Sequence, residues 1–180
     1  MSCLDAEDTW RWKCTTTCNF SFATAWELVR GAGIKFDLAD IVLYPFNSPK
    51  MSMCLLRALK GKLLTRAFLK SIRITDNEQC ALCSSGQENI QHLSFQCPYS
   101  AYIWTLCRLK LGIPGPIRTL QEGANLLKEK FNKKCKSSIL AKVTFAAAVW
   151  HIWKERNHRI FQLQENHKTM VFRRLYEDVN

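Results

Sequence analysis

Four metal-binding side chains fall within 18 residues of this chain, in the order Cys-x2-Cys-x8-His-x4-Cys. They are Cys80, Cys83, His92 and Cys97. Three thiolates and one imidazole are the ligand set of a closed tetrahedral zinc site, in which no position stays open for water or a substrate. The spacing therefore predicts one structural Zn2+ that does no chemistry. The alternative is that these are ordinary buried cysteines, which behave as small hydrophobes, and a core histidine.

The residues around the array favour a metal-binding geometry. Residues 84–86 (Ser-Ser-Gly) give the chain a flexible loop after the first two cysteines, and a short helical turn is expected over 88–95. Cys97 directly precedes Pro98, and proline is favoured at the first position of a helix. The Cys97 sulfur should therefore lie near a helix N-terminus, where the helix dipole favours a thiolate.

The composition indicates a folded protein with reduced cysteines. Hydrophobic residues make up 47% of the 180 residues, which is enough for a core. The acidic N-terminus has no apolar signal region, so the nine cysteines are expected to be reduced, in a nuclear or cytoplasmic protein that is not secreted. The longest apolar stretch, 143–153, is too short to span a bilayer, so no membrane partner is expected.

The net charge of +11 is unevenly distributed along the chain. Residues 51–75 hold six basic and no acidic side chains, whereas 76–104, which hold the array, carry three acidic and no basic ones. Contacts to nucleic acid should therefore come from the flanking segments. The candidates are Arg57, Lys60, Lys62, Arg66, Lys70 and Arg73, with Lys128, Lys130, Lys133, Lys134 and Lys136 as a second surface. The alternative is that the basic excess only keeps helix faces solvated.

The hydrophobic pattern and the capping residues predict a mainly α fold: a helical zinc-stapled domain with a small N-terminal β-hairpin and a C-terminal helical extension. The Trp- and Thr-rich segment 8–22 is the expected hairpin. The Gly- and Pro-rich break at 112–116 predicts two domains, 8–111 and 117–180, and leaves open whether the C-terminal helices pack on the zinc domain. The helices are expected at 23–30, 49–60, 65–71, 98–110, 119–136, 138–162 and 169–178, with 34–47 as a connecting segment.

Four smaller groups of side chains could carry chemistry, but each has a simpler interpretation. They are Cys14 with Cys18, Asp37 with Asp40, His151 with Glu155 and His158, and Trp10 with Trp12. The cysteine pair and the histidine group have no further ligand nearby in the sequence, which favours structural roles over a second metal. The carboxylates are expected on a surface turn. The tryptophans could stack on single-stranded RNA, although packing in the core is the favoured interpretation.

Several ordered motifs agree with one known family. They are FSFATAW at 20–26, the PK…RAL.GKLLTR segment at 49–66, Glu88 within the Cys/His array, Tyr-Ile-Trp at 102–104, and W-x-x-W-x-ERN-x-R-x-F at 150–161. The chain resembles the reverse transcriptase zinc-binding domain at the C-terminal end of plant non-LTR (LINE-type) retrotransposon polyproteins. It departs from that pattern at Leu43, Leu56 and Leu64, where tryptophans and a proline are expected, but keeps all four ligands.

The resemblance implies a non-catalytic zinc-binding module that binds nucleic acid, RNA in preference to DNA. The polymerase and endonuclease domains of such polyproteins do not fit in 180 residues, and the chain has neither the adjacent Asp-Asp of a two-metal polymerase site nor a Gly-rich phosphate loop. No enzymatic activity and no small-molecule substrate are therefore expected. Two alternatives are a module that docks on a reverse transcriptase polypeptide and a remnant without present activity.

Overall fold

The computed structural model describes residues 11–13, 16–17, 19–30, 36–113, 115–133 and 135–179. Its contacts divide the chain into two compact units, Met1–Phe36 and Asp37–Asn180. The described part is mainly helical, as the sequence predicts. Its helices are α1 (Phe22–Arg30), α2 (Ala39–Val42), α3 (Pro49–Leu59), α4 (Arg66–Ser71), η1 (His92–Gln96), α5 (Pro98–Leu111), α6 (Leu120–Lys130), α7 (Lys136–Phe161) and α8 (Lys168–Val179).

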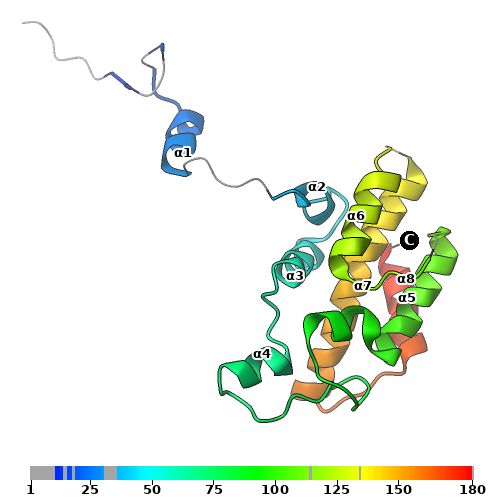
Figure 1. Ribbon diagram of the computed structural model, residues 1–180. Helices are drawn as coiled ribbons and strands as arrows, with labels where there is room; N and C mark the ends of the chain where they lie inside the picture. The colour runs from blue at the N-terminus through cyan, green and yellow to red at the C-terminus, as the bar shows by residue number, and fades with distance from the viewer. Residues whose placement is uncertain are drawn as a thin grey trace, which may run out of the picture. The chain divides into compact units, whose positions relative to one another are not determined.

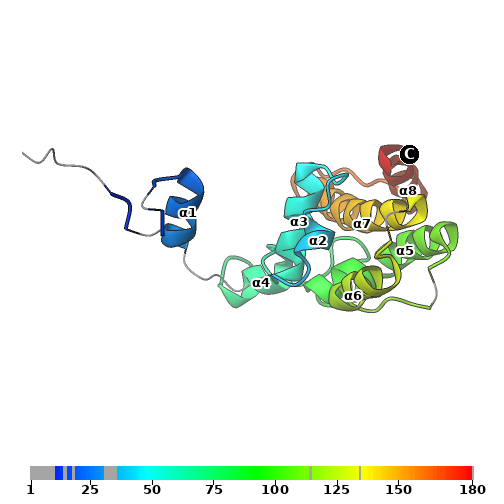
Figure 2. The same cartoon turned by 90° about the horizontal axis from the view of Figure 1, so that it is seen from above.

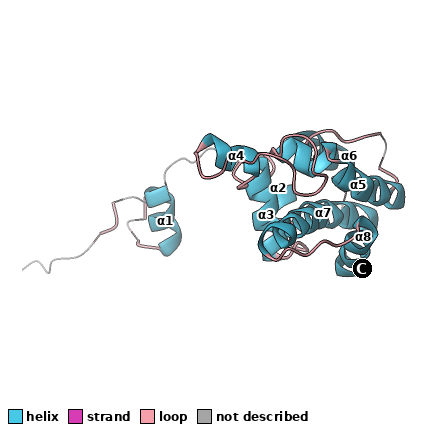
Figure 3. Ribbon diagram, turned by 90° about the horizontal axis from the view of Figure 1, so that it is seen from below, coloured by secondary structure: helices cyan, strands magenta, loops and turns pink. Residues whose placement is uncertain are grey.

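The predicted N-terminal β-hairpin is wrong for the residues of 8–22 that the structure describes. None of them lies in a strand, and Figure 3 shows helices and loops only; the one β-type pairing in the described ranges is an isolated bridge between Gln79 and Gln87. A two-stranded hairpin without further packing is marginal in water. Ser21 instead accepts a hydrogen bond from the Thr24 backbone N–H (3.2 Å), which starts α1 within the expected second strand. Trp10, Cys14 and Cys18 lie outside the described residues.

The second unit is organised around α7. Residues 141–149 of this helix are all buried, which is the pattern of a helix covered on every side. Helices α3, α5, α6 and α8 each contact it and surround it in Figures 1 and 2. No helix of the described residues is both long and apolar enough for a membrane span.

Capping side chains fix several helix starts where the sequence places them. Thr65 accepts a hydrogen bond from the Phe68 backbone N–H at 3.4 Å, and Thr119 accepts one from the Glu122 backbone N–H at 3.1 Å. The long helix, expected at 138–162, is confirmed within two residues. The preceding helix ends at Lys130 rather than at 136, with Phe131 as its C-cap residue, and α7 begins at Lys136.

The sequence leaves open whether the C-terminal helices pack on the zinc domain, and the structure shows that they do. Both α7 and η1 contact α5, and α8 contacts α5 as well. Trp104 of α5 stacks on Phe95 with ring centroids 4.8 Å apart, and it lies 5.3 Å from Phe145 of α7. Its indole N–H donates to the Ser94 carbonyl at 2.7 Å. The division into domains at 112–116 stays a prediction, but helices from both sides of it share this core.

The connecting segment 34–47 contributes more than the sequence predicts. Leu38, Ile41 and Val42 are buried, the latter two in α2. A four-residue helix is too short to show a hydrophobic period, so the pattern gives no signal for it.

Candidate metal centre

The four side chains of the Cys/His array converge on one point. Their donor atoms all lie within 4.8 Å of one another. The sulfurs of Cys80 and Cys97 are 3.9 Å apart, and the Cys83 sulfur lies 3.4 Å from His92 Nε2. Tetrahedral zinc with ordinary bond lengths would hold two sulfurs about 3.8 Å apart and a sulfur and a nitrogen about 3.6 Å apart. The donor set and its spacing fit one Zn2+, with Nε2 as the imidazole ligand.

A tight turn brings the first two cysteines together. The Ser84 backbone N–H donates to the Cys80 carbonyl at 2.8 Å, and the Cys80 N–H donates to the Gly86 carbonyl at 3.0 Å. Gly86 has a φ of +72°, which glycine adopts without strain. A Cβ at this position would lie 3.3 Å from His92 Cε1. The glycine thus allows both the turn and the close approach of the imidazole ring.

His92 opens a π-helical turn, and Cys97 follows that turn. The expected helical turn is therefore present, with π geometry over His92–Gln96, a form that is rare and often found at functional sites. Asn89 fixes its start by accepting a hydrogen bond from the His92 backbone N–H at 2.8 Å. Cys97 is the N-cap residue of α5 and Pro98 its first residue, so the sulfur lies at a helix N-terminus as predicted.

Burial divides the four ligands into two pairs. Cys80 and Cys97 are buried, whereas Cys83 and His92 are partly exposed, so one edge of the site is near the surface. The hydrogen bond from Cys80 and the nearby backbone of Ser100 and Tyr99 lower the pKa of Cys97. That hydrogen bond and burial raise the pKa of Cys80. Zinc binds the thiolate form of cysteine, so metal binding at this pair would release the thiol protons.

A buried carboxylate, Glu88, connects the metal loop (residues 76–97) to its surroundings. Its side chain has no exposed surface. Oε1 accepts hydrogen bonds from the Arg66 backbone N–H at 2.9 Å and from the Arg156 guanidinium at 2.8 and 3.0 Å, and Oε2 accepts one from the Ala81 N–H at 3.0 Å. One side chain therefore joins the turn between the cysteines, the start of α4 and the C-terminal part of α7.

Arg156 completes this connection from α7. It is 2% exposed, its Nη2 also donates to the Leu64 carbonyl at 3.1 Å, and its guanidinium lies 4.8 Å from the centre of the Trp153 ring. A buried charge is tolerated only with a partner and hydrogen bonds, and Glu88 supplies both. The ERN motif of the tail thus has a structural role at the metal loop.

Arg159, one turn later, holds the cysteine turn directly. Its Nη1 donates to the Leu82 carbonyl at 3.0 Å, and its guanidinium lies 4.7 Å from the centre of the Tyr99 ring. Glu155 accepts a hydrogen bond from Arg159 Nε at 3.0 Å and others from the Asn166 backbone and amide groups at 2.8 and 2.9 Å. These contacts fix the end of α7 against the metal loop.

The remaining candidate sites do not assemble. The Cys/His array is the single group of three or more metal-capable side chains that the described ranges bring together. His151, Glu155 and His158 border one small hollow, but they do not form a metal-binding group: His151 hydrogen bonds to Asp178 at 3.0 Å, and Glu155 is committed to Arg159 and Asn166. Asp37 accepts a hydrogen bond from Lys128 of the second basic cluster.

The basic residues of the first cluster differ in how far the protein itself engages them. Five are exposed and Arg66 is partly buried. Arg66 Nη1 donates to the Gln79 carbonyl at 2.8 Å, and Lys70 forms an ion pair with Glu78 at 3.1 Å, a hydrogen bond that lowers the pKa of Glu78. Arg57 and Lys62 form no ion pair with a carboxylate of the described residues. Lys134 of the second cluster lies outside the described residues.

Sequence reasoning missed the network that supports the metal loop. Glu88, Arg156 and Arg159 all belong to motifs that the sequence displays, yet nothing in their spacing shows that they pair. Glu88 and Arg156 are 68 residues apart. The signal that could have indicated the pairing is the presence of Arg156 in a long, largely apolar helix, since a buried charge requires a partner.

Comparison with known proteins agrees with the geometry. Residues 20–104 match a family model described as zinc-binding in reverse transcriptase, and all four ligands lie within the match. No curated protein and no solved structure matches the chain. The match covers just under half of the 180 residues. Residues 20–104 are therefore similar to the zinc-binding domain of reverse transcriptases, and the Cys80/Cys83/His92/Cys97 cluster fits the one Zn2+ of such a domain.

Proposed function

We propose that this chain is a non-catalytic zinc-binding module, derived from the reverse transcriptase polyprotein of a plant LINE-type retrotransposon, that binds nucleic acid. RNA is the preferred partner over DNA. The Zn2+ would be held by Cys80, Cys83, His92 and Cys97, and its role would be to hold the metal loop in shape.

The observation that carries the proposal is the attachment of a cationic segment to the metal loop. Besides its hydrogen bond to the Arg66 N–H, Glu88 accepts one through its backbone carbonyl from the Ala67 N–H at 3.1 Å. The segment held in this way is the basic arm (residues 49–73), which contains seven Lys and Arg side chains and no acidic one. A fixed row of exposed cations suits the phosphates of a nucleic acid.

Within the basic arm, the cations around the end of α3 are the best contacts. Arg57 lies in the last turn of α3, Lys60 is its C-cap residue, and Lys62 follows in the turn. All three are exposed. Arg66 and Lys70 contact Gln79 and Glu78 of the metal loop. We expect Arg57, Lys60 and Lys62 to make phosphate contacts, and Arg66 and Lys70 to hold the arm in place.

Fluorescence anisotropy of the zinc-loaded chain with single-stranded RNA, across a salt series, tests the proposal. The variant is R57Q/K60Q/K62Q, and the matched control is K130Q/K133Q/K136Q in the second basic cluster. Each lost phosphate contact on a single strand reduces the slope of log K against log salt by about 0.7, so the first variant should lose about 2. Binding that is absent near physiological salt, or that weakens only in the control variant, would contradict the proposal.

A docking module for a reverse transcriptase polypeptide is the second candidate, and one observation favours it. An open hollow of about 400 Å3 at α2 and α3 is lined by apolar side chains such as Leu43, Tyr44, Pro45 and Leu56. Leu43 is 69% exposed and Met53 is 53% exposed. Exposed apolar patches often mark protein contacts. Binding of a polymerase polypeptide that L43K abolishes, with RNA binding unchanged, would favour this function.

A further inference from the structure

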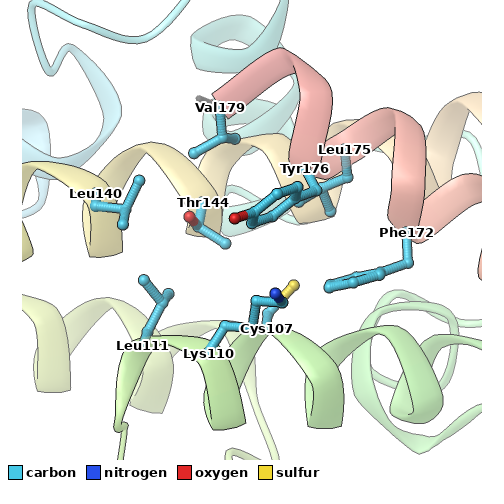
Figure 4. A pocket seen from close by; sticks show the side chains of 9 residues that line it. All are labelled: Cys107, Lys110, Leu111, Leu140, Thr144, Phe172, Leu175, Tyr176 and Val179. Atoms are coloured by element: carbon cyan, nitrogen blue, oxygen red, sulfur yellow. The ribbon is translucent and has the colours of Figure 1, made fainter.

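Two hollows in the second unit differ in the side chains around them. One, of about 100 Å3 between α5, α7 and α8, is lined mainly by aliphatic and aromatic groups (Figure 4). Its single charged side chain, Lys110, has its ammonium 4.6 Å from the centre of the Tyr176 ring. The other, of about 160 Å3 between α3 and α7, gathers three cations and two tryptophans. It is lined by Lys50, Met53, Cys54, Arg57, Lys62, Leu63, Leu64, Trp150 and Trp153.

The two tryptophans of the second hollow are not committed to the core. Trp150 and Trp153 are three residues apart on α7, so they share one face of the helix, and both are partly exposed. Trp104, in contrast, is 6% exposed and donates its indole N–H to the Ser94 carbonyl. No group of the described residues accepts a hydrogen bond from the indole N–H of Trp150 or Trp153. The Arg156 guanidinium covers one face of the Trp153 ring, 4.8 Å from its centre, but both rings keep part of their surface exposed and both indole donors stay available.

The charges around this hollow have one sign. Lys50, Arg57 and Lys62 are exposed, and no carboxylate lines the hollow. The Lys50 ammonium lies 5.8 Å from the centre of the Trp150 ring, which places positive charge directly beside the aromatic surface. Cations that gather around an apolar hollow without a counter-charge favour a ligand that is anionic at its edge and apolar at its centre.

We infer that the hollow between α3 and α7 binds an unpaired nucleobase of a single-stranded nucleic acid, while Lys50, Arg57 and Lys62 contact the phosphates on either side. This inference rests on the proposed function and extends it from phosphate contacts to a base-stacking site. Single strands are bound by this combination of aromatic rings and a cationic groove. The volume lies below the roughly 300 Å3 of pockets for drug-sized ligands, so it suits one base rather than a larger molecule. A duplex, whose bases are already stacked, would not offer the base.

The first test changes the ligand and leaves the protein intact. Anisotropy is measured with the zinc-loaded full chain and three probes: a mixed-sequence single-stranded RNA, an abasic strand of equal length and charge, and the corresponding duplex. Loss of base stacking should weaken binding of the abasic strand by about 5- to 150-fold. The same probes in DNA distinguish the two kinds of nucleic acid. Equal affinity for the intact and the abasic strand overturns the inference and leaves the phosphate contacts of the proposed function standing.

The second test assigns the stacking to this hollow. W150L should weaken binding of the intact strand but should have little further effect on the abasic strand, since the two changes remove the same interaction. Trp26, which is 63% exposed in α1, provides the matched control variant W26L. Circular dichroism and zinc content check that W150L stays folded; if it does not, K50Q at the rim replaces it. If W150L and K50Q bind the intact strand as tightly as the unchanged protein, the inference is overturned. Absence of RNA binding in every arm would contradict the proposed function itself.

Discussion

The metal loop and the basic arm are neighbours in the sequence, but they depend on different interactions. The metal loop (residues 76–97) adds Leu82, Leu93 and Phe95 to the core, but its cysteine turn depends on polar contacts: the four candidate zinc ligands, the buried Glu88 and the guanidinium of Arg156. The basic arm (residues 49–73) packs one face of α3 on α7 through Met51, Leu55 and other apolar residues. Its cations are largely exposed, and Lys50, Arg57 and Lys62 border the hollow between α3 and α7.

This difference shows how the two regions divide their roles. A loop held by polar contacts and a metal has little tolerance for change, because each buried polar group loses its partner when another is removed. The exposed cations of the arm can be replaced at small cost to stability. The loop and the arm are joined where the backbone N–H groups of Arg66 and Ala67 donate hydrogen bonds to Glu88. The metal loop is therefore the part that fixes the position of the surface proposed to bind nucleic acid.

Removal of the metal should have the largest effect on stability, and that effect should be concentrated in the metal loop. We expect C97S, or chelation of the unchanged protein, to unfold the metal loop and to lower the Tm of the unit, because structural zinc contributes about 10–16 kcal/mol of apparent binding free energy in small zinc domains at pH 7. Amide hydrogen exchange should accelerate most in 76–97 and at the start of α4. Differential scanning fluorimetry and zinc content by mass spectrometry measure the result.

The matched control is C135S, since Cys135 is exposed and lies far from the array in the sequence. It should keep one zinc per chain and an unchanged Tm. A C97S protein that retains full zinc content and the original Tm would show that the array is a group of ordinary core cysteines and not a metal site.

Loss of the Glu88 carboxylate charge should have the next largest effect. In E88Q the guanidinium of Arg156 keeps its burial but loses its counter-charge, which for buried pairs costs about 3–5 kcal/mol. Urea unfolding of the zinc-loaded protein measures the difference. E165Q is the control, because Glu165 is 75% exposed and lies 3.8 Å from Arg159, and it should change the free energy of unfolding by less than about 1 kcal/mol.

A double variant shows whether the effect belongs to this pair. Adding R156M to E88Q removes the unpaired charge, so the double variant should be less destabilised than the sum of the two single variants. Simple additivity would mean that Glu88 acts mainly through the backbone N–H groups of Arg66 and Ala81.

The sequence predicts well the features that depend on neighbouring residues. The ligand array lies within 18 residues, and the starts of α4 and α6 follow from Thr65 and Thr119 acting as capping residues. Each of these rests on a local physical rule that the fold does not override. The ligands of the candidate metal centre can therefore be predicted from the sequence alone.

Features that depend on residues far apart in the sequence cannot be predicted in this way. The hairpin expected at 8–22 rests on β-propensity without a sheet to complete it, and the chain forms α1 from Phe22 instead. Trp150 and Trp153 appear in the sequence only as part of the tail motif, and it is their position beside α3 that shows that they border a hollow. The pairing of Glu88 with Arg156 likewise depends on the tertiary fold.

Substitution of a glycine in each region gives the smallest and most selective test of the comparison. Gly86 in the metal loop has a φ of +72° and Gly61 in the basic arm has a φ of +69°, so alanine costs each about 1–2 kcal/mol in backbone strain. A Cβ on Gly61 meets no atom within 4 Å, whereas one on Gly86 lies 3.3 Å from His92 Cε1. G86A and G61A should therefore lower the free energy of unfolding by similar amounts, but only G86A should also weaken zinc binding, because it displaces the imidazole. Competition with a chromophoric chelator measures the zinc affinity. Equal zinc affinities in the two variants would mean that the His92 ring adjusts freely, and that the metal loop is less rigid than its hydrogen bonds indicate.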